Sequence, residues 1–359
     1  MTADKYMRWD AAGVEHGAGA EEDALIAEVC AQINESQTRV RDAHHHAFTG
    51  THVKTHGVVK GSLEVLPNLP AHLAQSMFAK QATYPVAIRF SSEPTDLVPD
   101  TQRAPRGMAI KVFNVDGEKL RQDGKDPRTQ DLEFNNATAI ELGNARVTRD
   151  IIGLRLKHSD DASALQAELK KRDDYAVQKA RDEIPNTPLV AHRQYSQAAM
   201  RFGDYVAKLA LVPVGDTQKA LEAKELPEET NEKTGLRQNL EQFLQQNTAT
   251  WELQAQLLED LEQQPVEDAR VEWPQDKFPY QTIARLSVPP QECFLPQRVN
   301  FWRDQMRLDP WYGLASLQPL GSVNRLRKGV YAASSAHRRR LNGGVPVVSV
   351  ASVDELPDE

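Results

Sequence analysis

The apolar positions change period along the chain, from helical spacing near the start to alternation further on. Between Ala24 and Ile33 they recur at helical spacing behind the acidic run Glu21-Glu22-Asp23. Acidic side chains in a first turn favour a helix N-terminus. We therefore predict an amphipathic helix over residues 22 to 42.

From about residue 58 onward, apolar residues alternate with others in several short runs. Val86, Ile88 and Phe90, for example, alternate with residues that include Arg89 and Ser91, which is the pattern of a half-buried strand. Roughly six strands at uneven intervals favour an antiparallel sheet or barrel. The other runs lie at residues 108–112, 205–212, 250–257 and 280–288.

Helical, charge-rich stretches lie between these runs, at Asp150 to Arg172 and at Thr217 to Gln246. We interpret them as helices with solvated faces, packed outside the sheet. A last helix is predicted over Ser322 to Leu341, with Ser322 as its N-cap and Gly343-Gly344 as its stop.

Composition restricts the class of protein. Of the 359 residues 40% are hydrophobic and 26% are charged, as in ordinary soluble proteins. The length alone allows one large domain or two. The polar, acidic segment Met1 to Glu22 has no apolar core of signal-peptide type, and no stretch approaches the roughly 20 apolar residues of a membrane span, so we expect a cytoplasmic protein.

The net charge of −8 argues against a nucleic-acid surface, although the run Arg325 to Arg340 is basic. Cys30 and Cys293 lie far apart without CxxC spacing, so we expect two buried thiols and neither a disulfide framework nor a zinc knuckle.

On the last helix, Arg327, Tyr331, Ser334 and Arg338 fall on one stripe of one face. A phenol, with a pKa near 10, must lose its proton to bind ferric iron, and a guanidinium one turn away favours the phenolate. Tyrosine is one of the few protein ligands of haem iron. The alternative is a structural pair in which Arg327 only stacks on or bonds to the ring.

Five histidines cluster at His44, His45, His46, His52 and His56. His52 and His56 have i, i+4 spacing, and imidazole suits zinc, copper or iron. Against a dedicated metal site, no Asp or Glu lies between Ala43 and Leu63, and Gly50 and Gly57 interrupt any helix there. For His44 to His46 we expect solvated residues at a helix end.

Taken in order, five segments resemble motifs of the catalase superfamily. His52 lies in Thr-His-Val-Lys, similar to the family's His-Ala-Lys-Gly segment, and Arg89-Phe90-Ser91 matches its Arg-Phe-Ser strand. Residues 105–111, Pro-Arg-Gly-Met-Ala-Ile-Lys, resemble Pro-Arg-Gly-Phe-Ala-Val-Lys, and residues 131–136 fall where the family has Asp-Leu-Val-Gly-Asn-Asn. Arg327-x-x-x-Tyr331, with Arg338 seven residues on, matches the helix that ligates the haem.

The departures point to a minor branch of that family. Thr51 replaces the valine before the histidine, as in allene oxide synthases, the relatives that rearrange fatty-acid hydroperoxides. Thr49 replaces an arginine that contacts a haem propionate, and Ala139-Ile140 replace an aromatic pair, which widens the expected pocket. The chain is too short for the extra C-terminal helices of true catalases. Pro319 to Arg325 also resembles the small bacterial catalase-related proteins.

The resemblance implies an α+β fold, an antiparallel closed β-barrel with surrounding helices. A single haem domain would span residues 1–359, with a helical arm (1–45), the barrel and inserted helices (46–290), and the haem-ligating helix and tail (291–359). Tyr331 would be the axial ligand of haem b, supported by Arg327. Arg89, Ser91 and Arg338 would contact the cofactor on its periphery.

On the opposite face the resemblance makes His52 the acid/base residue, with Asn135 binding the peroxide and Thr51 modifying how His52 is held. We expect a peroxidase or isomerase of organic, fatty-acid hydroperoxides with weak catalase activity. The alternatives are a small catalase that degrades hydrogen peroxide and a haem-binding sensor or carrier without useful turnover. The expected partner is a peroxide or organic hydroperoxide, without nucleic acid or an integral membrane segment, and a homodimer is compatible with the resemblance.

Overall fold

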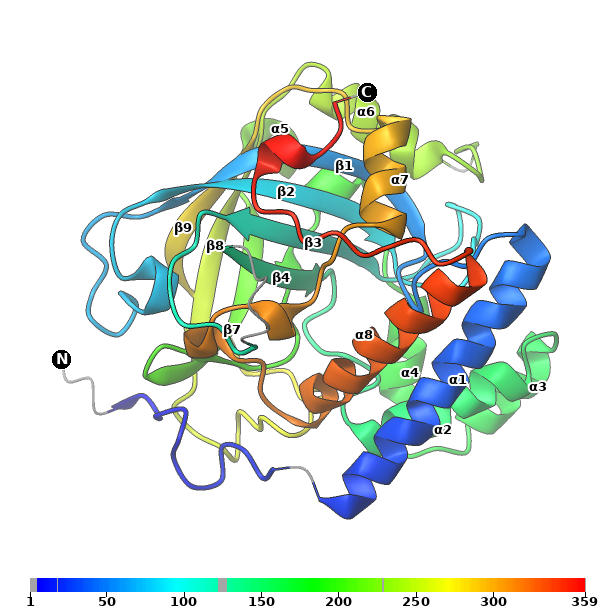
Figure 1. Cartoon of the computed structure of the whole chain (residues 1–359). Coiled ribbons are helices and arrows are strands. Elements are labelled where there is room, and N and C mark those ends of the chain that lie inside the picture. Colours follow the sequence, from blue (N-terminus) through cyan, green and yellow to red (C-terminus); the bar gives the residue numbers. More distant parts are fainter. Residues whose placement is uncertain (1–4, 18, 122–127, 228, 359) are drawn as a thin grey trace.

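The computed structural model describes residues 5–17, 19–121, 128–227 and 229–358. Residues 1–4 and 18 of the N-terminal segment therefore lie outside the described residues. Among those described, eight antiparallel strands close into a barrel in the order β1-β2-β3-β4-β5-β7-β8-β9, because β9 pairs with β1 and β5 pairs with both β4 and β7. The predicted closed antiparallel barrel with surrounding helices is confirmed (Figure 1).

The strand alternation predicted from the sequence separates an inner from an outer barrel surface. On β2, Ile88 and Phe90 point into the apolar barrel core, while Arg89 and Ser91 point outward. All five predicted runs are strands, and β6 is a short extra strand beside β7. The strands are β1 (Lys54–Val65), β2 (Thr83–Ser92), β3 (Arg106–Phe113), β4 (Thr129–Asn135), β5 (Gln194–Tyr195), β6 (Met200–Phe202), β7 (Tyr205–Pro213), β8 (Ala249–Leu257) and β9 (Gln281–Val288).

Helices cover the outside of the barrel. α1 and α8 lie side by side with α2 next to them, and Val29, Ile33, Ile152 and Leu326 form the apolar cluster between these three (Figure 1). The α-helices are α1 (Ala20–His44), α2 (Ala145–Lys157), α3 (Ala162–Leu169), α4 (Tyr175–Asp182), α5 (Asp216–Lys219), α6 (Gly235–Leu244), α7 (Pro296–Asp304) and α8 (Ser322–Leu341). Short 3-10 turns are η2 (Ser76–Phe78), η3 (Leu189–Ala191), η4 (Pro310–Tyr312), η5 (Ala315–Leu317) and η6 (Val353–Glu355).

α7 packs on a different part of the outer surface of the barrel. Its Val299 and Trp302 pack against outward-facing Val58, Ala87 and Phe113 of β1, β2 and β3. The chain that follows α7 turns back toward α8 and therefore lies between the barrel and that helix (Figure 1).

Two helix predictions need correction. The stretch from 150 to 172 is two helices, α2 and α3, because Asp161 caps a new helix by accepting a hydrogen bond from the Ala164 amide at 2.9 Å. Among the described residues of the stretch from 217 to 246, only those of α5 and α6 are helical, and the stretch contains Pro227, a residue that interrupts a helix.

The N-terminal end of α8 also differs from the prediction. Gly321, with φ of 84°, is the N-cap, and Ser322 is already inside the helix. The Ser322 hydroxyl instead accepts a hydrogen bond from the Ala145 amide at 3.1 Å and donates to Glu22, so it joins α8 to α2 and α1.

Two expectations about the whole chain can be compared with the described part. No helix there is both long and apolar enough to cross a bilayer. Cys293 is buried as expected, whereas Cys30 is only half-buried, and both are free thiols.

Candidate functional site

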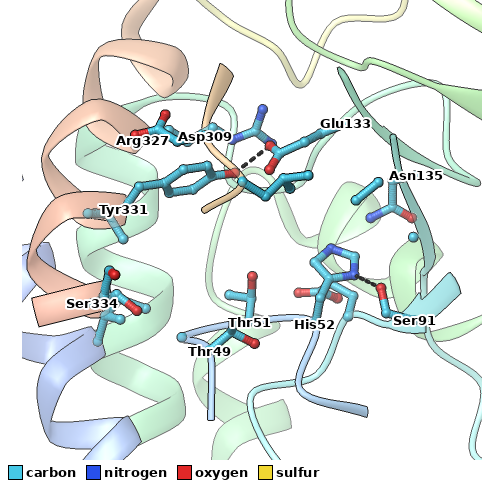
Figure 2. A pocket seen from close by; sticks show the side chains of 18 of the residues that line it. Thr49, Thr51, His52, Ser91, Glu133, Asn135, Asp309, Arg327, Tyr331 and Ser334 are labelled. Atoms are coloured by element: carbon cyan, nitrogen blue, oxygen red, sulfur yellow. Dashed lines mark hydrogen bonds between the residues drawn. The ribbon is translucent and has the colours of Figure 1, made fainter. Parts of the chain in front are cut away.

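A cavity with a volume of about 510 Å³ lies between the outer face of the barrel and helix α8. It is within the range of about 300 to 1,000 Å³ that ligand pockets commonly occupy. The structure brings every predicted site residue into its lining: Thr51, His52, Arg89, Ser91, Asn135, Arg327, Tyr331 and Arg338. Figure 2 labels six of them, all except Arg89 and Arg338. Tyr331 approaches from α8, whereas His52 and Asn135 lie across the cavity on the barrel side.

His52 lies just before β1 in a backbone conformation that side chains rarely adopt. Its φ is 52°, in the left-handed region, and such residues persist only where their surroundings hold them. Arg89 stabilises this conformation. Its Nη2 donates a hydrogen bond to the His52 carbonyl, and its Nε donates one to Thr55 Oγ1 at 2.8 Å. Arg89 therefore fixes the backbone of the candidate acid/base residue.

The His52 ring is held by the same strand. Its Nδ1 lies 3.1 Å from Ser91 Oγ (Figure 2), and the ring packs on Gly107 of β3, where a Cβ atom would lie 2.4 Å from Cε1. Burial, together with the positive charge of Arg89, lowers the pKa of His52 to about 3. The imidazole is therefore neutral near pH 7 and can accept a proton.

Asn135, the last residue of β4, places an amide beside His52. Its Oδ1 accepts a hydrogen bond from the Asn136 amide at 2.8 Å, so its Nδ2 group is left to donate toward the cavity. Thr51 also lines the cavity, next to His52. The Nδ1 partner of His52 is Ser91, so the Thr51 hydroxyl does not hold that nitrogen.

Tyr331 lies across the cavity, on the inward stripe of α8. Its hydroxyl donates a hydrogen bond to Glu133 Oε2 (Figure 2). Burial raises the pKa of the phenol well above its ordinary value of 10, and the carboxyl of Glu133 raises it further. Arg327 opposes both effects, as predicted, but in this arrangement it does not outweigh them.

Sequence analysis missed Glu133. It stands where the family motif has valine, and its carboxyl, whose pKa is raised by burial, is the phenol's acceptor. The sequence did contain a signal for Glu133. It lies two residues before Asn135 on one strand, and residues two apart on a strand point to the same face. Because Asn135 was expected to face the cavity, Glu133 could have been expected there too. Asp309, in the loop before η4, also lines the cavity, and burial raises its pKa to about 7.

The polar end of the cavity is strongly basic. Arg89 and Arg338 are buried residues, only 6% and 7% exposed. Burial lowers the pKa of Arg89 to about 9, with further contributions from the charges of Arg338 and Arg303. Nε of Arg338 and Oγ1 of Thr49 are buried and have no hydrogen-bond partner in the described part of the chain. Unpartnered donors beside mutually repelling cations are suited to an anionic group such as a carboxylate.

The other end of the cavity is apolar. Leu326 precedes Arg338 by twelve residues on α8, or about 18 Å along the helix axis. Around Leu326 the lining is aliphatic and comes from three helices and the loop after β4: Val29, Ile33, Ile140, Leu142, Ile152, Val323 and Val330.

A cofactor with carboxylates at one edge and an apolar remainder matches this division, so the residues present fit haem. Tyr331 is placed on one side of the cavity as the candidate axial ligand, and Arg89 and Arg338 are the candidate partners of the propionates. Glu133 is discordant, because its carboxyl occupies the hydrogen-bonding direction of the phenol.

Three other histidines of the cluster, His44, His46 and His56, have protein partners. His56 is buried on β1 with Nε2 2.7 Å from Ser92 Oγ. His44 lies 2.7 Å from Asp96, and His46 lies 2.9 Å from Asp304 of α7, so His46 is more than a solvated residue at a helix end. Within the described residues, no group of three or more His, Cys, Asp or Glu side chains is arranged to hold a metal ion.

Comparison with known families and with curated proteins found no match for this sequence. Comparison with solved structures found catalases. Catalase A from Saccharomyces cerevisiae has a TM-score of 0.63 at 18% identity, covering 84% of this chain and 62% of its own. A fungal catalase gives 0.63 at 17%, covering 84% and 61%, and a bacterial catalase gives 0.61 at 14%, covering 95% and 66%. This chain thus spans about three fifths of their length, and the likeness shows a catalase-like fold.

Proposed function

We propose that this protein is a haem-dependent peroxidase or isomerase of organic, fatty-acid hydroperoxides, with weak catalase activity. One observation carries the proposal: a single cavity has a phenol on one wall and, opposite it, a neutral imidazole beside an amide donor. An axial ligand and an acid/base pair facing each other are what a haem peroxidase needs.

In this proposal Tyr331 would ligate the iron of haem b, Arg327 would favour its phenolate form, and Arg89 and Arg338 would bind the propionates. Haem supplies, when bound, the iron chemistry that cleaves an O–O bond. Glu133, which accepts the phenol's hydrogen bond, has to release it before Tyr331 can serve as a ligand.

His52 and Asn135 then handle the substrate. The neutral imidazole accepts the proton of the hydroperoxide OH group and returns it to the departing oxygen, so that the imidazole ends neutral again. Asn135 donates a hydrogen bond to the peroxide from Nδ2, and Ser91 and Arg89 keep His52 in place. Heterolytic O–O cleavage with an external electron donor gives a peroxidase, whereas homolytic cleavage within an organic hydroperoxide gives an isomer.

The preference for organic hydroperoxides rests on two departures from the catalase pattern. Thr51 places a hydroxyl next to His52, and Ala139-Ile140 replace an aromatic pair beside the cavity. Smaller side chains there leave room for a substrate larger than hydrogen peroxide. An ordinary small catalase is the alternative if these substitutions do not change the preferred substrate.

A haem-binding protein without useful turnover is favoured by one specific contact. The hydrogen bond from Tyr331 to Glu133 competes with axial ligation, which would suit weak or reversible haem binding more than repeated turnover.

A visible spectrum combined with a peroxide titration tests the proposal. The purified full chain is reconstituted with haem and titrated with hydrogen peroxide and then with a fatty-acid hydroperoxide. A ferric spectrum with phenolate charge-transfer bands and faster consumption of the organic substrate would support it. Failure to bind haem would overturn the proposal, and binding without consumption of either peroxide would leave the non-turnover alternative.

A further inference from the structure

A second cavity, of about 730 Å³, lies between α4, the loop after β4 and the segment that leads into β5. Glu141, Tyr195 and Gln197 line both this cleft and the first cavity, so the two spaces share a wall. Since haem would fill most of the first cavity, a long substrate chain has to find room elsewhere. The adjoining cleft offers such a space.

The cleft has a wall of small apolar side chains. On α4 these are Ala176, Val177 and Ala180, which recur on one face of the helix, and Ala137 and Ala139 face them from the loop after β4. Such a surface accepts an alkyl chain without bulky side chains in the way.

A buried polar atom without a partner lies in the same lining. His192 is 6% exposed, and its Nε2 lies 3.0 Å from the Thr187 carbonyl, so Nε2 carries the proton. Burial lowers the pKa of His192 to about 4, which leaves the ring neutral and Nδ1 an acceptor. Nδ1 has no hydrogen-bond partner among the described residues, and an unmet buried acceptor is costly.

The cations of the cleft already have carboxylate partners. Arg181 lies 2.6 Å from Glu93, Arg270 lies 2.6 Å from Asp268, and Arg193 pairs more loosely with Glu222 at 3.8 Å. The polar atom without a partner is therefore the acceptor His192 Nδ1, which favours a ligand that donates a hydrogen bond over an anion.

We propose that this cleft binds the acyl chain of a hydroperoxide whose remote end group is neutral and donates a hydrogen bond to His192 Nδ1. The end group is a hydroxyl or an amide N–H, as in a monoacylglycerol or a fatty amide, and a free carboxylate is disfavoured. This inference rests on the proposed function, because it deepens the substrate class of the same site.

Binding can be tested without turnover by using reduced ligands, in which a hydroxyl replaces the hydroperoxide. Isothermal titration of the full, haem-loaded chain compares three ligands with one acyl chain: the monoacylglycerol, the methyl ester and the free acid. We expect the monoacylglycerol to bind about 10-fold more tightly than the other two, the usual effect of one buried hydrogen bond to an otherwise unmet group. Replacing the glycerol ester by a primary amide distinguishes hydroxyl from amide donors.

Substitutions test whether His192 causes the preference and whether the cleft binds the acyl chain. His192→Phe should abolish the preference for the monoacylglycerol, whereas His192→Asn, which keeps a carbonyl acceptor near Nδ1, should retain part of it. Ala180→Trp should fill the cleft and weaken all three ligands, with Lys179→Trp on an exposed position of the same helix as the matched control. Far-UV circular dichroism and the melting temperature check that each variant is folded.

The proposal is overturned if the free acid binds as tightly as the monoacylglycerol, or if folded Ala180→Trp binds like the Lys179→Trp control. The result is separable from the proposed function, because the reduced ligands have no O–O bond. A protein that fails the peroxide titration but shows the donor preference would lose the proposed chemistry and keep the binding site.

Discussion

Gly107→Ala should disable the histidine side of the cavity without touching the tyrosine side. An added Cβ would lie 2.4 Å from Cε1 and 2.5 Å from Nδ1 of His52. Ordinary contacts between such atoms need about 3.5 Å, so the imidazole has to move by roughly 1 Å. A displacement of that size in a reacting group can reduce turnover by about 100-fold.

The ring has little freedom to relax. Its backbone is held in the left-handed region by Arg89, and Nδ1 is bound to Ser91 Oγ, which would itself lie 3.1 Å from the new Cβ. The clash is therefore relieved by rotating the imidazole away from Ser91 and out of line with Asn135. The three nearest atoms to the added Cβ belong to His52 and Ser91, so the Tyr331 side, which would ligate the haem, should be unaffected.

Peroxide consumption at matched haem concentration measures the effect. Gly107→Ala should keep its haem spectrum and lose about 100-fold in turnover, whereas Gly19→Ala, where no neighbouring atom lies within 4 Å of the added Cβ, should behave as wild type. Wild-type turnover in Gly107→Ala would refute the assignment of His52 as the acid/base residue or the tight packing on which this expectation depends.

Tyr331→Phe should lose most haem, and retention of the Soret and charge-transfer bands of the wild type would show that another residue is the ligand. Glu133→Val should act in the opposite direction, raising haem occupancy in a titration because the phenol is no longer bound to a carboxylate; equal occupancy would mean that Glu133 does not compete. His52→Ala should keep its haem and lose about 100-fold or more in peroxide turnover, and unchanged rates with both peroxides would eliminate its role. Thr51→Val should raise oxygen release from hydrogen peroxide several-fold at unchanged haem content, as read by an oxygen electrode; a wild type that is already as fast would favour a small catalase.

The strands and the two long helices could be predicted because their residues repeat one pattern over many positions, whereas the closure of the strands into a barrel was expected only from the resemblance. On β2 the alternation of Ile88 and Phe90 with Arg89 and Ser91 is uninterrupted, and α8 extends over residues 322–341 as predicted. All eight predicted site residues meet in one cavity. Periodicity did not predict that these residues would meet. That prediction came from motifs whose order along the chain is typical of one family.

Features that depend on contacts across the fold could not be predicted. The role of Glu133 depends on a hydrogen bond from Tyr331, which lies 198 residues away in the chain. The roles of Arg89 and Ser91 in holding His52 depend on the pairing of β2 with β1 and on one left-handed residue. Helix breaks such as the one capped by Asp161 depend on local hydrogen bonds that compete with a continuous apolar pattern.

The division of β2 into an inner and an outer row has a consequence for how this protein can change. Because odd positions such as Arg89 and Ser91 serve the ligand cavity and even positions such as Ile88 and Phe90 fill the barrel, substitutions in one row leave the other chemically untouched. Natural variation or laboratory evolution can therefore diversify specificity while the scaffold stays constant. An insertion or deletion of one residue in this strand has the opposite effect, since it exchanges the two rows and removes scaffold and chemistry together.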